Sequence, residues 1–180
     1  YYDGMPLGTP NDQGSGIRLG QSVGGKTDHM DRVTAWRFLN PPLAFAQGIV
    51  VNKNGRRFCN EMVYGATLGD AMCENNEGKA YLIVDEKLFN DAKKQSKEAL
   101  PFQRDMARML MYFNAKKKSN LIDLAKVYNL PADTLTEEIE KYNQAARSQS
   151  PCEFGKGPSD VKELNGPFHI MDISIDSKLA

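Results

Sequence analysis

An Asn-Gly pair between two short runs constrains the local fold more than any other feature of this chain. Asn54 and Gly55 separate the run IVV (49–51) from the run RFC (57–59). Both residues of an Asn-Gly pair tolerate the positive φ values that a tight turn between antiparallel strands requires. The pattern therefore predicts a β-hairpin over residues 49–59.

The composition is that of an ordinary folded domain. The chain has 180 residues, of which 41% are hydrophobic and 26% are charged, enough for one domain with a core. Lys plus Arg equals Asp plus Glu, 23 of each, so no net charge attracts the chain to nucleic acid. No apolar run approaches the roughly 20 residues of a membrane span.

The N-terminus has no features of a signal peptide, and a cytoplasmic location is expected. The first residues, YYDGMPL, lack an initiating Met and suggest an excised or processed piece, which need not carry the targeting information of the parent protein. Three cysteines, Cys59, Cys73 and Cys152, are widely spaced and form no metal-binding pattern with His29 or His169. We expect free thiols and no metal site.

Several further segments carry helix or strand patterns. The expected helices span 16–23, 66–78, 102–113, 119–130 and 131–148, and the expected strands span 81–84 and 166–176. Ser15 and Asp85 are expected to cap helices, because an oxygen at that position accepts a backbone N–H of the first turn. The sequence thus predicts an α+β fold, a small sheet with a hairpin plus several helices.

Three further segments have a predicted local conformation or environment. Residues 28–38 are predicted to be extended, ended by Pro41 and Pro42. Lys116–Lys118 is expected to be a solvated connection between helices. The stripe at helical spacing in 102–113 is predicted to be core; its members are Met106, Met109, Leu110 and Phe113.

The glycine-rich stretch GSGIRLG, residues 14–20, is a candidate ligand-contacting corner. It departs from the dinucleotide fingerprint G-x-G-x-x-G, and no strand precedes it. It is therefore not expected to bind a nucleotide alone. Glycine still lets the backbone approach a ligand that other residues hold.

The residues NEMVYG (60–65) extend the hairpin by a tail that a hairpin does not need. Its Tyr64 is a candidate acid or base, although a phenol serves as one only when its neighbours tune it. The alternative is a turn tyrosine whose ring packs on the hairpin.

The chain resembles the middle of the fumarate reductase/ketosteroid dehydrogenase family of FAD flavoproteins. The resemblance rests on three blocks in order, GSGIRLGQSVGGKTDHMD, GIVVNKNGRRFCNEMVYG and NLIDLAKVYNLPADTLTEEIEKYNQAAR, the last followed by FGK. It implies a capping domain that closes over a flavin held by a Rossmann-type FAD domain.

This resemblance also implies a domain organisation. Residues 1–42 are expected to connect from the FAD-binding domain, 43–150 to form the capping domain, and 151–180 to return. FAD is then held mainly by parts of the parent protein outside this chain, and the remaining FAD-binding domain is the partner. The chain alone is expected to be inactive. The resemblance places Gly14, Ser15 and Gly16 at the cofactor, with Ser15 where the family usually has an acidic residue.

The two branches of the family differ in their site residues. Fumarate reductases place a substrate-binding His near the position of Trp36 and a proton-donating Arg just after the NE, and this sequence has neither. A dicarboxylate would then depend on Arg37 or Arg104, since its recognition favours cations with fork geometry.

The ketosteroid dehydrogenase branch matches better, because its NE-x-x-Y-G appears here as 60–65, followed by Gly69. In that branch the cap tyrosine points at the substrate and takes part in moving the proton. Tyr64 is therefore the predicted catalytic residue. The predicted substrate-binding residues are Trp36, Arg37, Phe38, Met62 and Gly65.

The expected function is that of part of an FAD-dependent oxidoreductase. It would transfer a hydride between flavin and a bulky carbonyl substrate such as a 3-ketosteroid, with dehydrogenation next to the carbonyl. One alternative is reduction of an unsaturated acid in the manner of fumarate reductase. Another is a non-catalytic α+β module that binds a partner through the hairpin.

Overall fold

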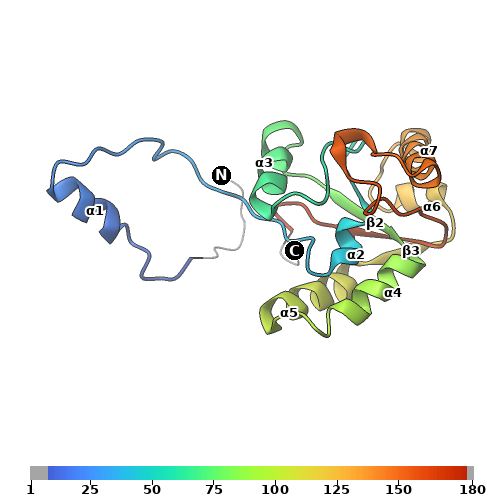
Figure 1. Ribbon diagram of the computed structural model, residues 1–180, viewed down its shortest axis with the longest axis horizontal. Helices are drawn as coiled ribbons and strands as arrows, with labels where there is room; N and C mark the ends of the chain where they lie inside the picture. Colours follow the sequence, from blue (N-terminus) through green and yellow to red (C-terminus); the bar gives the residue numbers. More distant parts are fainter. Residues whose placement is uncertain (1–7, 178–180) are drawn as a thin grey trace.

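A four-stranded antiparallel sheet forms the centre of the molecule, whose computed structural model describes residues 8–177 (Figure 1). Its order is β1 (Ile49–Val51), β2 (Tyr81–Asp85), β4 (Phe168–Asp172) and β3 (Lys116–Lys118). Every residue of β1 is buried, as are all but one in each of β2 and β4. The predicted strands 81–84 and 166–176 are thus confirmed in place.

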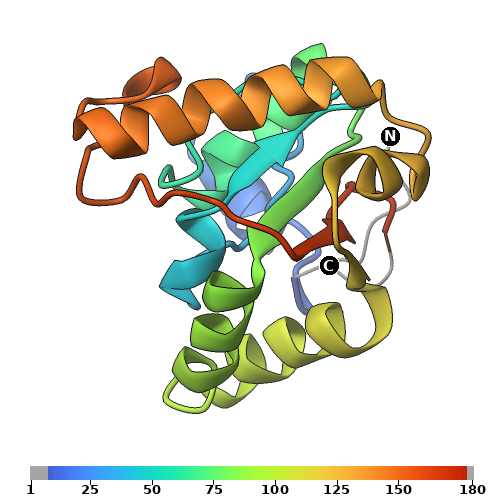
Figure 2. The same ribbon diagram turned by 90° about the vertical axis from the view of Figure 1, so that its right-hand side faces the viewer.

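Helices cover both sides of this sheet (Figure 2). On one side lie α3 (Gly65–Asn75) and α7 (Ala132–Ser148), and on the other lie α4 (Glu86–Gln95) and α5 (Pro101–Met109). The remaining helical segments are α2 (Leu43–Ala46), η1 (Leu110–Asn114), α6 (Leu121–Lys126) and η2 (Glu153–Gly155). The predicted α+β mixture of helices and a small antiparallel sheet is therefore confirmed.

Side-chain oxygens cap the first turns of two helices. Asp85 accepts the Leu88 N–H at 2.8 Å and caps α4, as predicted, and Asn120 accepts the Asp123 N–H at 2.8 Å and caps α6. Side-chain acceptors of this kind satisfy a backbone donor that the helix itself leaves unpaired.

The first helix, α1 (Ser15–Ser22), lies on an arm that projects from the body (Figure 1). None of its residues is buried. The prediction that Ser15 caps this helix was wrong. Gly14 holds the capping position in a left-handed conformation, with φ of 73°, and no side chain caps the helix.

The predicted hairpin was only half right. Its turn forms, with Gly55 at a φ of 72° and the Asn52 side chain accepting the N–H groups of Asn54 and Arg56. The second strand is reduced to one bridge between Val51 and Arg57, and β1 pairs with β2 instead. In place of that strand, the Glu61 side chain accepts the Val50 N–H of β1 at 3.0 Å.

Residues 28–38, which are predicted to be extended, form no helix and join no sheet. The prediction for Lys116–Lys118 was wrong, because these exposed residues form the edge strand β3 rather than a connection between helices. Exposed lysines on an edge strand discourage pairing with another chain. The predicted core stripe was wrong for Met109 and Phe113, which are 40% and 58% exposed, whereas Leu110 is buried.

The predicted domain boundaries at 42/43 and 150/151 stay predictions. The strand β4, from the predicted return segment, lies between β2 and β3 in one sheet. Within residues 8–177, no helix combines the length and the apolar character that a membrane span needs.

A buried histidine in β4 makes the stability of this fold depend on pH. His169 stacks on Phe89 with ring centroids 3.8 Å apart and shares a hydrogen bond with Glu86 at 2.8 Å. Burial lowers the pKa of His169, although Glu86 opposes this effect.

The unfolded chain therefore binds the proton of this residue more readily than the folded chain, and stability rises with pH where that proton is lost. We expect thermal stability to fall as the pH drops below about 6.5, the ordinary pKa of histidine. Melting curves from pH 7.5 to 5 would show this fall, and the variant His169→Gln should show a smaller one. An equal fall in both proteins would contradict the assignment to His169.

Candidate functional site

Two glycines on one face of α3 let an extended segment lie against the helix backbone. A Cβ atom on Gly65 would stand 2.8 Å from the Arg37 carbonyl oxygen, and one on Gly69 would collide with the Ala35 carbonyl oxygen. The Arg37 N–H donates to the Gly65 carbonyl oxygen at 3.1 Å. Only glycine permits so close an approach. The spacing G-x-x-x-G thus docks residues 35–37 beside the start of α3.

This docking brings four aromatic side chains together, which we call the aromatic row. Trp36 lies between Tyr64 and Phe38, with ring centroids 4.5 Å and 5.1 Å away. Phe102, from the first turn of α5, extends the row, 6.5 Å from Phe38. The exposed fractions are 64% for Tyr64, 40% for Phe38 and 52% for Phe102. The row is an exposed apolar surface with a phenol at one end.

Phe102 was missed as a site residue by the sequence analysis, which placed it only in a helix. Its place in the row depends on a contact between segments more than 60 residues apart, and no local pattern reports such a contact. The row itself joins two predicted substrate-binding residues, Trp36 and Phe38, to the predicted catalytic Tyr64.

Arg37 lies next to the row in sequence, but its guanidinium is directed elsewhere. It is buried and donates to the backbone carbonyl oxygens of Ile173, at 2.6 Å, and Ser174. Burial lowers its pKa to about 10. Arg37 therefore ties the docked segment to the C-terminal part of the chain, and its substrate contact stays a prediction.

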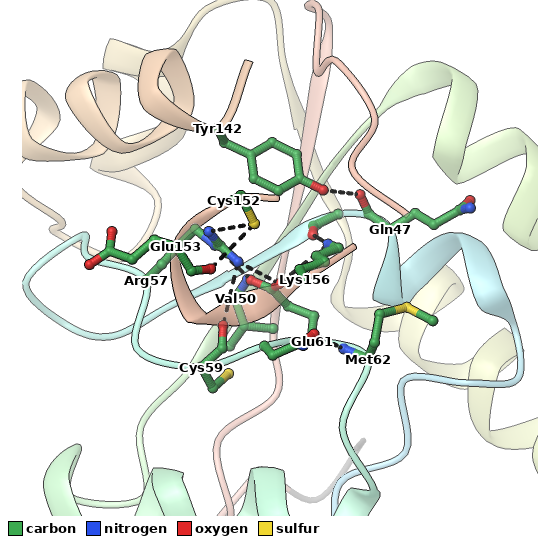
Figure 3. Close-up of polar contacts among 12 residues, drawn as sticks. Gln47, Val50, Arg57, Cys59, Glu61, Met62, Tyr142, Cys152, Glu153 and Lys156 are labelled. Atoms are coloured by element: carbon green, nitrogen blue, oxygen red, sulfur yellow. Dashed lines mark hydrogen bonds and ion pairs between the residues drawn. The ribbon is translucent and has the colours of Figure 1, made fainter. Parts of the chain in front are cut away.

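Three charged side chains are buried together where the hairpin tail begins, and we call them the buried charge cluster (Figure 3). Arg57 donates through Nε and Nη2 to the two Glu61 carboxylate oxygens, at 2.9 and 2.8 Å. The Lys156 ammonium lies 3.2 Å from Glu61 and donates to the Gly48 carbonyl oxygen at 2.7 Å. The carboxylate also accepts the Val50 N–H of β1 at 3.0 Å.

The last of these contacts explains the missing hairpin strand, because the Glu61 carboxylate replaces a backbone acceptor beside β1. Burial alone would lower the pKa of Arg57, but the hydrogen bonds and charge of Glu61 outweigh it and raise that pKa. Burial lowers the pKa of Lys156 against the opposing effect of Glu61. The Tyr142 ring faces both cations, 5.1 Å from Arg57 and 4.9 Å from Lys156.

The glycine corner of residues 14–16 lies on the projecting arm, apart from α3 (Figure 1). Its backbone is open, because a Cβ atom on Gly16 would meet no atom within 4 Å. The three cysteines form no disulfide, and burial raises the pKa of Cys59 to about 12. No group of three or more metal-binding side chains occurs in the described part of the chain.

Comparison with known proteins relates this arrangement to flavoproteins. The model of the family described as "FAD binding domain" matches residues 5–177. The 3-oxo-5-alpha-steroid 4-dehydrogenase of Comamonas testosteroni is 39% identical over 99% of this chain and 34% of its own length. The chain thus spans about a third of that relative.

Two solved structures share the fold. The crystal structure of 3-ketosteroid-delta4-(5alpha)-dehydrogenase from Rhodococcus jostii RHA1, in complex with 4-androstene-3,17-dione, matches 89% of this chain and 32% of its own, with 26% identity and a TM-score of 0.70. A solution structure of the fumarate reductase flavoprotein subunit from Lactobacillus plantarum matches 83% of this chain and 97% of its own, with 20% identity and a TM-score of 0.60.

These matches favour the flavoprotein hypothesis over a partner-binding module. The family model alone covers nearly the whole chain, including the glycine-rich stretch of residues 14–20 and the aromatic row. The chain therefore belongs to the FAD binding domain family.

Proposed function

We propose that this chain comprises the capping domain, residues 43–150, and its two connections in an FAD-dependent dehydrogenase that acts on a 3-ketosteroid or a similarly bulky carbonyl compound. The observation that carries the proposal is the exposed aromatic row with Tyr64 at its end. Two similar proteins, from Comamonas testosteroni and Rhodococcus jostii, are named as steroid dehydrogenases.

The aromatic row suits a large, flat, neutral substrate. Aromatic rings offer apolar area to such a ligand and lose little conformational freedom when they bind it. A dicarboxylate would instead favour a guanidinium fork, and the Arg37 guanidinium donates to backbone carbonyl oxygens. The row therefore favours a steroid-like substrate over fumarate.

Tyr64 is proposed to move the proton in this reaction. Among residues 8–177, its hydroxyl makes no hydrogen bond in the structure, so it is available to a substrate carbonyl or the adjacent carbon. Dehydrogenation next to a carbonyl removes one hydrogen as a proton and the other as a hydride. FAD, when bound, supplies the hydride acceptor.

The residues on the arm fit a supporting role toward FAD. The left-handed Gly14 and the open Gly16 leave the backbone at the start of α1 accessible to a large ligand. The Ser15 hydroxyl is a hydrogen-bonding group at the same corner. The main cofactor contacts are assigned to the polypeptide outside this chain.

A substrate comparison with the full-length protein tests the proposal. We expect the protein with bound FAD to oxidise a ring-saturated 3-ketosteroid with an artificial electron acceptor, and to yield the unsaturated ketone. Reduction of fumarate by a reduced dye, without any steroid turnover, would contradict it.

The aromatic row also makes a prediction about substrate affinity. In the full-length protein, Phe102→Ala is expected to raise KM for the steroid about two- to tenfold, since an aromatic contact contributes about 0.5–1.5 kcal/mol. Phe113→Ala is a matched control, because Phe113 is also exposed but pairs with Tyr112 outside the row. Equal KM values in the two variants would show that Phe102 does not contact the substrate.

A further inference from the structure

Glu61 of the buried charge cluster lies three residues before Tyr64 in sequence, and the cluster joins three separate parts of the chain. Glu61 belongs to the hairpin tail, Val50 and Gly48 lie at β1, and Lys156 comes from the loop after α7. Four donor contacts converge on the Glu61 carboxylate, whose side chain is fully buried. This carboxylate is held in one place by the sheet, by Arg57 and by Lys156.

A short, hydrogen-bonded turn connects Glu61 to Tyr64. The Asn60 side chain accepts the Met62 N–H at 2.9 Å, and the Asn60 carbonyl oxygen accepts the Val63 N–H at 3.2 Å. Tyr64 then begins α3, since its carbonyl oxygen accepts the Leu68 N–H at 3.1 Å. Both residues between Glu61 and Tyr64 thus donate their backbone N–H groups to Asn60.

We propose that the buried charge cluster is a positioning device for Tyr64, and that Glu61 is the positioning residue through which it acts. Of its tests, only the one that measures steroid turnover rests on the proposed function. Tyr64 is itself mostly exposed, so few contacts other than Trp36 and this turn determine where its hydroxyl stands.

The arrangement of charges explains why replacing Glu61 should disturb the buried charge cluster most. If Glu61 loses its charge, Arg57 and Lys156 remain buried as two cations without a carboxylate between them. Like charges in such a site repel, and removing one partner of a buried ion pair leaves the others uncompensated. We therefore expect Glu61→Gln to move the turn that carries Tyr64, while most of the fold persists.

The chain offers a matched control and a built-in reporter. Glu138 on α7 is also a buried carboxylate, paired with Arg56 at 3.3 Å and Lys141 at 3.6 Å, and among residues 8–177 it makes no hydrogen bond or ion pair with the cluster or the turn. Trp36 is the only tryptophan of the chain, and its ring contacts Tyr64. Its fluorescence therefore reports the position of Tyr64 without any substrate or flavin.

The first test uses the 180-residue chain, since a relative of almost this extent has a solution structure as a separate chain. At a temperature where circular dichroism shows each variant folded, Glu61→Gln should change the Trp36 emission maximum or intensity, and Glu138→Gln should leave both unchanged. Unchanged Trp36 emission in folded Glu61→Gln would overturn the proposal.

A second variant keeps the test decisive if Glu61→Gln does not fold. Lys156→Met preserves the Arg57–Glu61 pair and removes the two hydrogen bonds of the Lys156 ammonium, to Glu61 and to the Gly48 carbonyl oxygen. We expect it to fold and to change Trp36 emission in the same direction by a smaller amount. Folded Lys156→Met with wild-type emission would then overturn the proposal.

Turnover of a 3-ketosteroid by the full-length protein provides the second readout. Glu61→Gln should lower kcat about tenfold or more and change KM less than twofold, because misplacing a reacting group by about 1 Å can cost 10²-fold. Glu138→Gln should change neither constant. Equal losses of kcat in both variants would contradict the proposal and show that Glu61 acts only by stabilising the fold. If wild type turns over no steroid, the proposed function fails, and the Trp36 comparison still decides the positioning role.

Discussion

Gly69→Ala is expected to destabilise the folded chain, although alanine normally stabilises a helix relative to glycine. The added Cβ collides with the Ala35 carbonyl oxygen, so either the docked segment 35–37 or α3 must move. Overpacking of this kind costs about 1–3 kcal/mol. For a chain of this size we expect the melting temperature to fall by roughly 2–10 °C. Thermal melts followed by circular dichroism would measure it.

Gly20→Ala is the matched control for this substitution. Gly20 also lies in a helix, and a Cβ there would meet no atom within 4 Å. Its replacement should leave stability unchanged or raise it by about 0.4–1 kcal/mol, since alanine restricts the unfolded chain. If Gly69→Ala is no less stable than Gly20→Ala, the close packing of residues 35–37 on α3 is contradicted.

The same collision has a consequence for the candidate site. Trp36 is part of the docked segment, and its contact with Tyr64 depends on the approach that Gly65 and Gly69 permit. Displacement of this segment would separate the two rings. A stability defect in Gly69→Ala should therefore come with a change in Trp36 fluorescence.

The sequence predicted those parts of the fold whose causes are local. Asp85 supplies the oxygen that caps α4, and the predicted helix over 131–148 is found as α7, Ala132–Ser148. The Asn54-Gly55 turn also formed, because its requirement for a positive φ is met by Gly55 itself. Each of these features needs only neighbouring residues.

The predictions that failed depended on distant residues. The second hairpin strand was replaced by the Glu61 carboxylate, which Lys156, 95 residues away, helps to hold. The spacing of Met109 and Phe113 marks a helix face but does not show what covers it. The aromatic row needed a contact between Phe38 and Phe102, so the sequence identified only part of the site.

Resemblance to a family located Tyr64, and the structure supplies a physical reason for the residues around it. Gly65 and Gly69 allow the docked segment to approach, and Glu61 anchors the turn. The residues of the motif around Tyr64 therefore hold this tyrosine at an apolar surface. Its role in proton transfer is a proposal that one substitution can test.

Tyr64→Phe is expected to have the largest effect on activity of any change considered for this chain. It removes the hydroxyl and keeps the ring that contacts Trp36 at 4.5 Å. Because the side chain is 64% exposed, stability should hardly change. General acid–base catalysis typically contributes 10²–10⁴-fold, so kcat should fall by about that factor while KM changes little.

The most direct measurement is therefore steroid turnover by the full-length protein with bound FAD, comparing wild type with Tyr64→Phe at matched flavin content. We predict a loss of about 10²–10⁴-fold in kcat, with an unchanged melting temperature. A Tyr64→Phe variant that retains activity within a few-fold of wild type would contradict the proposed role of Tyr64.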